Sequence, residues 1–155
     1  MPDATETKAR LSLPDYLPYR LSVASNQVSG LIARAYQDRF GLTIWEWRVV
    51  AVLGEAEPQT AQGLVEATAM DKVTVSRAVR SLAGKGHVAR SRHHSDGRSA
   101  MIRLTPPGRA MYDDIAPAAL KLERDLLDGF GKSEIARFMG MLAELESRAG
   151  TLAET

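Results

Sequence analysis

Apolar positions at helical spacing define the first predicted element. Residues 1–14 are mostly polar, and we expect them to form a flexible arm. Asp15 is expected to cap a helix that runs to about Phe40 and ends at Gly41. Its apolar residues recur every three or four positions over nearly three heptads, namely Leu17, Leu21, Ala24, Val28, Leu31 and Ala35. This seam within 15–41 suits packing inside one subunit and an interface between two subunits equally well.

A capping box predicts the next helix, over about 43–54. In this motif the Thr43 oxygen accepts a backbone N–H and the Glu46 carboxylate reaches back to the cap. The residues that this helix is expected to place in the core are Ile44, Trp47, Val50, Ala51 and Leu53. Thr60 is expected to cap a short helix over about 61–67.

The following helix separates apolar from basic side chains. Asp71 caps it, it runs over 72–85, and Gly86 supplies the left-handed residue at its end. At about 100° per residue, one side gathers Val75, Ala78, Val79 and Leu82. The other side gathers Thr74, Arg77, Arg80, Ser81 and Gly84. This second side carries two guanidinium groups and two hydroxyls without an acid.

Alternating residues then predict a two-stranded hairpin over 88–104, with a long basic tip. Thr105 caps a long helix that begins with two prolines, which the first turn of a helix tolerates. Ser133 is expected to cap a final helix. One face of that helix gathers Ile135, Phe138, Met139, Leu142 and Leu145.

Composition narrows the class of protein. The 155 residues fit one compact domain with appended helices, and the 45% hydrophobic and 25% charged contents are those of globular chains. The absence of cysteine excludes disulfides, zinc–thiolate sites and a cysteine nucleophile. No apolar run approaches the roughly 18 residues of a membrane span, and the first residues lack a signal-peptide core. We therefore expect a cytoplasmic protein without a membrane partner.

The net charge of +1 hides an uneven distribution. The window 72–109 holds nine basic residues and a single acid, Asp96, and so carries +8, while the rest carries −7. On charge alone this window is either a solvated face or a nucleic-acid site. The nucleic-acid interpretation is favoured when the basic residues lie on elements that fit a groove of DNA.

The element order supplies that fit. Three helices followed by a basic hairpin within 42–104 predict a winged helix-turn-helix, in a mainly α-helical chain with a small β-hairpin wing. The recognition helix is expected in the major groove, where Arg77, Thr74 and Ser76 would lie nearest the bases. Phosphate contacts are expected from Lys72, Arg80, Arg90, Arg92 and His93. Arg98 at the wing tip is expected in a minor groove, oriented by Asp96.

Several motifs resemble the multiple antibiotic resistance regulator (MarR) family. Residues 73–90 look like that family's recognition helix and first wing strand, and Leu42-Thr43 with Trp47 looks like its second helix. Ser95-Asp96-Gly97-Arg98-Ser99 matches its wing-tip Asp-x-Arg motif. Leu104-Thr105-Pro106-Pro107-Gly108 matches the Leu-Thr-x-x-Gly start of its long helix. The resemblance covers about 17–148.

The resemblance implies a homodimer whose segments 15–41 and 105–155 intertwine with those of a partner, which assigns the apolar seam to an interface. It also implies a repressor of transcription that reads a palindromic operator in double-stranded DNA and is released by a small organic ligand. Asp96 and Arg98 would take the wing-tip roles. The major-groove roles would fall to Thr74, Ser76, Arg77 and Arg80.

The resemblance leaves one induction mechanism open. Because the chain has no cysteine, release from DNA by thiol oxidation is excluded. The adjacent His93-His94 and the isolated His87 do not make a metal site, so no metal or cofactor is expected. In the family the ligand is often an aromatic anion. The candidate slot for it combines two indoles with two cations: Arg20, Trp45, Trp47 and Arg48. Trp47 suits the core better than this slot.

Two other classes of protein are the alternatives to a sequence-specific regulator. An enzyme is not expected, because Ser81 and Lys85 are four residues apart instead of the three of a Ser-x-x-Lys motif. The chain also lacks a P-loop, a Gly-x-Ser-x-Gly motif and a dinucleotide fingerprint. A non-specific architectural DNA-binding protein shares the basic window and remains the alternative.

Overall fold

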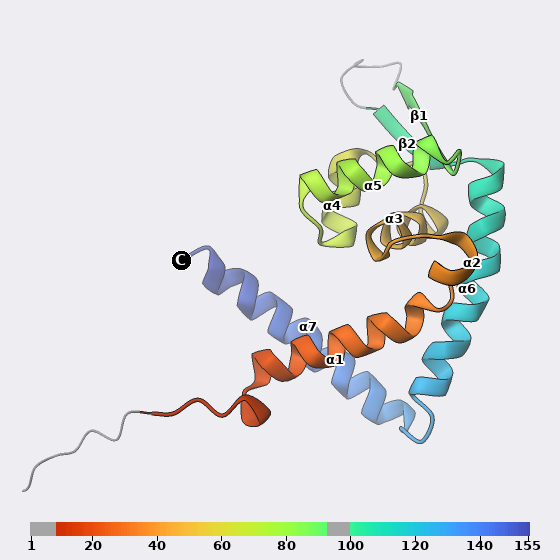
Figure 1. Cartoon of the computed structure of the whole chain (residues 1–155). Coiled ribbons are helices and arrows are strands. Elements are labelled where there is room, and N and C mark those ends of the chain that lie inside the picture. Colours follow the sequence, from red (N-terminus) through yellow and green to blue (C-terminus); the bar gives the residue numbers. More distant parts are fainter. Residues whose placement is uncertain (1–8, 93–99) are drawn as a thin grey trace, which may run out of the picture. The chain divides into compact units, whose positions relative to one another are not determined.

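The computed structural model describes residues 9–92 and 100–155 (Figure 1). Contacts within the chain divide it into two compact units, 1–120 and 121–155. The elements are η1 (Leu13–Asp15), α1 (Leu17–Ala33), α2 (Gln37–Phe40), α3 (Ile44–Glu55), α4 (Ala61–Thr68), α5 (Lys72–Gly84), β1 (Val88–Arg92), β2 (Ala100–Leu104), α6 (Pro106–Leu126) and α7 (Lys132–Ala153). The chain is therefore mainly α-helical with one antiparallel hairpin, which confirms the predicted fold class.

The core of the first unit lies between α3, α4, α5, the hairpin and the first half of α6. Figure 1 shows α4 and α5 beside each other, with the hairpin against α5. All of these elements contribute buried side chains to one apolar cluster, which includes Val49, Val50, Leu53, Leu64, Val75, Val79, Leu82, Val88, Ile102, Met111 and Ile115. The four residues predicted for the inner side of α5 all lie in this core. Three helices packed around one apolar centre therefore fix the orientation of α5.

The hairpin is tied to the loop that precedes α4. β1 pairs antiparallel with β2, so that Val88 lies opposite Leu104 and Arg92 opposite Ala100. Gln59 exchanges two backbone hydrogen bonds with Ile102, at 2.9 and 2.8 Å. A single bridging residue has no periodicity, so no pattern along the chain indicated this pairing. The hairpin thus rests on a third backbone segment that comes from the helix-turn-helix.

The first unit carries the hairpin and is called the winged unit below. Its predicted N-caps are present. The Thr43 hydroxyl oxygen accepts from the Glu46 N–H at 3.1 Å, and Thr60 accepts from the Gly63 N–H at 3.0 Å. The Asp71 carboxylate accepts from the Thr74 N–H at 2.7 Å. These caps fix where α3, α4 and α5 begin, because each satisfies a backbone donor that the helix itself leaves free.

The reciprocal half of the predicted capping box is wrong. Glu46 does not reach back to its own cap; its carboxylate accepts from Lys85 Nζ at 2.8 Å and from the Ser81 hydroxyl at 3.4 Å. Glu46 is only 5% exposed, because α5 packs against this side of α3. A tertiary partner has replaced the local one.

The predicted first helix is shorter than expected and is broken. Asp15 belongs to the 3-10 turn η1, where it accepts from the Ser12 hydroxyl at 2.9 Å, and Tyr16 is the N-cap of α1. A turn at 34–36 separates α1 from α2, and Gly41 ends α2 as predicted, with a φ of 64°. The turn carries Tyr36 into the core, where its side chain is 2% exposed. Burial of this ring outweighs the helical periodicity that the sequence continues across 34–36.

The second unit contains α7 and the end of α6. Gly131, and not Ser133 as predicted, is the N-cap of α7, since the Glu134 carboxylate accepts from the Gly131 N–H at 2.7 Å. α7 buries none of its residues, and Phe138 and Met139 on its predicted apolar face are exposed. In the described part of the chain, no helix is long and apolar enough to span a membrane.

Candidate nucleic-acid interface

One side of α5 points away from the core and carries four exposed residues at helical spacing. These residues, which we call the α5 outer face, are Val73, Ser76, Arg77 and Arg80. They follow one another at positions i, i+3, i+4 and i+7, the spacing that places side chains along one stripe of a helix. Across 9–92 and 100–155, neither Arg77 nor Arg80 forms an ion pair. Both guanidinium groups are therefore available to a ligand outside the chain.

Two residues predicted for this side are engaged within the protein. The Thr74 hydroxyl donates to Asp71 Oδ2 at 2.8 Å, and Ser81 is half-buried and directed at Glu46. The N–H and the hydroxyl of Thr74 lower the pKa of the Asp71 carboxyl, which stays charged and holds the first turn of α5. Thr74 thus supports the start of the helix, and its hydroxyl proton is already donated.

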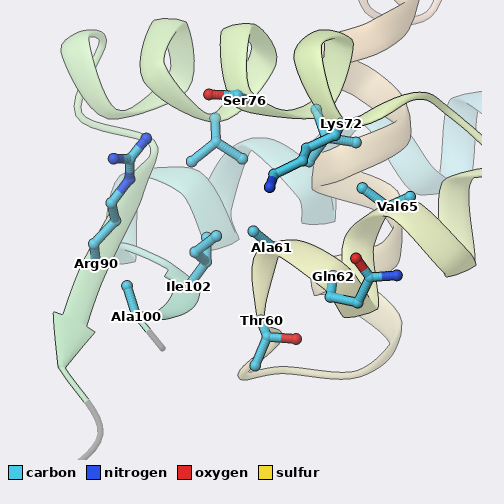
Figure 2. A pocket seen from close by; sticks show the side chains of 11 residues that line it. Thr60, Ala61, Gln62, Val65, Lys72, Ser76, Arg90, Ala100 and Ile102 are labelled. Atoms are coloured by element: carbon cyan, nitrogen blue, oxygen red, sulfur yellow. The ribbon is translucent and has the colours of Figure 1, made fainter. Parts of the chain in front are cut away.

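A pocket of about 410 Å³ lies between α4, α5 and the hairpin (Figure 2). Its walls are largely apolar and include Val65, Val75 and Ile102. Figure 2 shows Lys72 extending into it from the start of α5, with Arg90 on the hairpin across from Lys72. The helix and the hairpin thus each place a cation at one pocket, and cations of this kind are common contacts to DNA phosphates.

The two cations of β1 lie on one side of the hairpin, whereas Arg103 of β2 pairs with Ala89 and lies on the other side. Arg90 and Arg92 are two residues apart on β1 and both are exposed, so they share a face of the strand. The predicted contacts His93, Asp96 and Arg98 lie outside the described residues.

Ion pairs tie α5 and α6 to the rest of the winged unit. Lys85 Nζ donates to the buried Glu46 and anchors the end of α5 to α3. Arg109 of α6 donates to Glu57 Oε1 at 2.7 Å and to the Gly54 carbonyl at 3.2 Å. Two of the nine cations in the basic window are therefore structural. The sequence offered one signal, since Glu46 lies in the apolar stripe with Val49, Val50 and Leu53.

Glu57 links this ion pair to the base of the hairpin. Its second carboxylate oxygen accepts from the Leu104 N–H at 2.7 Å. Burial raises the pKa of Glu57, but the Leu104 N–H and the Arg109 guanidinium together outweigh burial and hold that pKa below its ordinary value. The ionised form therefore stabilises the folded state.

We expect this carboxylate to make stability pH-dependent. A pKa lowered by folding gives stability that is complete above the ordinary pKa of about 4.5 and is lost as the pH falls through the folded pKa. Urea unfolding of wild type and Glu57→Gln at pH 7, 5 and 3.5 measures this contribution. The difference in unfolding free energy should shrink on going from pH 5 to 3.5. A constant difference would show that the ionised form of Glu57 does not stabilise the fold.

The four residues of the predicted ligand slot occupy different surroundings. Trp47 stacks between Tyr36 and Tyr112, with ring centroids 5.6 and 6.4 Å away. Trp45 is 46% exposed, and the Arg48 guanidinium carbon lies 5.6 Å from its ring centroid. Arg20 is exposed on α1. The structure thus pairs Trp45 with Arg48 and places Trp47 in an aromatic stack that joins α3 to α6.

The candidate metal ligands of this chain are His, Asp and Glu side chains, since it has no cysteine. Within 9–92 and 100–155, no three His, Cys, Asp or Glu side chains gather closely enough to hold a metal ion. His87 lies between α5 and β1, and the other two histidines, His93 and His94, are outside the described residues.

Known proteins share this arrangement. The MarR family model matches residues 40–99, which run from the end of α2 into the wing. An uncharacterised helix-turn-helix transcriptional regulator of Bacillus subtilis, YwoH, is 31% identical over 108 residues, which make up 68% of this chain and 78% of YwoH. The chain belongs to the MarR family. This MarR-family protein is a DNA-binding transcriptional regulator, and the family is one of regulators and not of enzymes.

Other relatives extend the MarR similarity beyond the winged unit. The transcriptional repressor NicR of Pseudomonas putida is 24% identical over 141 residues, covering 84% of this chain and 87% of NicR. The crystal structure of a MarR/EmrR family regulator from Acinetobacter sp. ADP1 matches 91% of this chain and 99% of its own, with a TM-score of 0.83 and 26% identity. BpsR of Bordetella bronchiseptica, whose DNA binding is regulated by 6-hydroxynicotinic acid, shares the fold, with a TM-score of 0.80 and 22% identity over 89% of this chain and 98% of BpsR.

Proposed function

We propose that this MarR-family regulator is a repressor that reads a palindromic operator through the α5 outer face. The observation that carries the proposal is the pair of guanidinium groups at Arg77 and Arg80, which form no ion pair within 9–92 and 100–155. They lie on a helix whose start is fixed by a cap and whose end is fixed by an ion pair. Arg77 and Ser76 read bases, while Lys72, Arg80, Arg90 and Arg92 bind phosphates. From the sequence motif alone, we assign Asp96 and Arg98 to the wing tip, with His93 beside them.

The same regulator acts as a homodimer in this proposal. The seam of α1 leaves Leu17, Leu21 and Val28 exposed, and α7 leaves Phe138 and Met139 exposed. Apolar stripes of this length gain free energy when a partner covers them. A dimer also supplies two α5 helices, as a palindrome requires.

An aromatic acid is the proposed effector. Trp45 offers an exposed indole face with the Arg48 guanidinium beside it, a combination suited to an aromatic ring that carries a carboxylate. The DNA binding of BpsR is regulated by 6-hydroxynicotinic acid, which supports this class of ligand. The proposed contact is confined to Trp45 and Arg48, because Trp47 of the predicted slot is stacked between Tyr36 and Tyr112.

A footprint on DNA selected from a random pool tests the operator. We expect one protected palindrome whose half-sites lie about 10 base pairs, or one helical turn, apart. Analytical ultracentrifugation of the protein should give a mass twice that of the chain. Repeating the footprint with aromatic acids should identify a compound that removes protection. Even coverage of all duplexes at the same protein concentration would instead support the architectural DNA-binding alternative.

A further inference from the structure

An apolar side chain stands on the α5 outer face among polar and basic ones. Val73 is 60% exposed, although the other valines of α5, Val75 and Val79, are buried. It is the second residue of α5, directly after Lys72 and three residues before Ser76. Its side chain has no place in the core of this unit. A β-branched residue also adds little to helix propensity at that position, so neither packing nor local structure accounts for it.

The chemistry of the major groove offers such a side chain one partner. Base edges there present hydrogen-bond donors and acceptors, and the single apolar group among them is the 5-methyl of thymine. The N-terminal residues of a recognition helix are the ones that approach base edges. We propose that Val73 contacts a thymine methyl group in each half-site and so determines part of the sequence specificity. This proposal rests on the operator reading proposed for α5.

The cap of α5 holds Val73 for this contact. The Asp71 carboxylate accepts from both the N–H and the hydroxyl of Thr74, which fixes the turn of helix that contains residue 73. The Thr74 hydroxyl proton is used in that cap. Among residues 73–76, Val73 and Ser76 are the exposed ones. The start of the helix therefore offers the groove one aliphatic and one hydroxyl group.

The spacing to Arg77 predicts where the thymine lies. Val73 and Arg77 are four residues apart on one stripe, which is about 6 Å along the helix axis. Bases are separated by about 3.4 Å along a strand. The thymine is therefore expected within about two base pairs of the guanine that we assign to Arg77.

Replacing thymine by uracil removes the methyl group and leaves base pairing intact. We expect wild-type protein to bind about fourfold more weakly when one thymine in a half-site becomes deoxyuridine, because one buried methyl group is lost. Val73→Ala should bind the thymine and uracil duplexes equally well. Val73→Ile, the matched control, should keep the preference because it retains the branched aliphatic surface. Fluorescence anisotropy on the selected operator, with each thymine replaced in turn, gives these ratios.

The outcomes separate this inference from the operator proposal. A methyl-dependent position close to the guanine, present in wild type and absent in Val73→Ala, supports the contact. Equal responses of wild type and Val73→Ala to every uracil replacement would overturn it, even if the operator is bound tightly. Failure to select any operator would overturn the base-reading role of α5 itself. Since Val73 is exposed, Val73→Ala should melt at the wild-type temperature, and this measurement confirms that the fold is retained.

Discussion

Arg77→Ala is expected to weaken operator binding by about 1–3 kcal/mol per half-site and to relax the base preference at one position. Arg77 lies on the α5 outer face, exposed and without an ion pair among the described residues. A guanidinium group at this place pairs with both acceptors of a guanine. Removing it takes away affinity for the correct base and leaves the competing bases nearly unaffected.

Arg80→Ala is the matched control, because Arg80 shares the outer face and the charge of Arg77 but is assigned to a phosphate. Its loss should weaken all sequences about equally and lower the slope of log affinity against log salt by about one per half-site. Fluorescence anisotropy on the operator, and on duplexes with the guanine replaced, compares the two variants. If Arg77→Ala weakened every duplex by the same factor, Arg77 would be a phosphate contact and the base-reading assignment would be wrong.

Gly108→Ala is expected to destabilise the winged unit by about 1–3 kcal/mol. A Cβ added at Gly108 would overlap the backbone carbonyl oxygen of His87. This backbone cannot retreat freely, since the His87 carbonyl accepts from the Thr105 N–H at 3.0 Å and the Gly86 carbonyl accepts from the Thr105 hydroxyl at 2.6 Å. The close approach joins the start of α6 to the base of the hairpin, and an added methyl group must force them apart.

Gly84→Ala provides the control for helix propensity. Gly84 ends α5, and a Cβ added there meets no atom within 4 Å. Exchange of glycine for alanine without a clash leaves stability unchanged or raises it by up to about 1 kcal/mol. Urea unfolding should therefore give a lower midpoint for Gly108→Ala and an unchanged or higher one for Gly84→Ala. Equal midpoints for Gly108→Ala and wild type would contradict the packing of α6 against residue 87.

Local signals in the sequence predicted the elements of the candidate site well. The caps at Thr43, Thr60 and Asp71 are present because each involves groups three residues apart, and such short-range geometry depends on the sequence alone. The inner side of α5 followed from periodicity for the same reason. The turn at 34–36 was missed, because the burial of Tyr36 against Trp47 depends on a helix outside that stretch.

Longer-range partners could not be read from spacing. Glu46 was expected at its own helix cap but binds Lys85, which is 39 residues away. Gln59 lies between two predicted helices and pairs with Ile102, which is 43 residues away in the sequence. The predicted ligand slot shows the same limit: Trp45 and Trp47 are close in sequence, yet one is exposed beside Arg48 and the other is stacked between two tyrosines.

The sequence by itself determined where the cations lie along the chain and which side of α5 is polar, because charge and helical periodicity are local properties. Only the tertiary structure decided which of those cations are available. Packing of α5 and α6 on the α3 region brings Lys85 to Glu46 and Arg109 to Glu57, whereas Arg77 and Arg80 point outward. An ion pair forms between groups that folding brings within a few ångströms, and that distance is a property of the packed elements. The +8 window of the sequence is thus partly structural and partly a surface open to DNA.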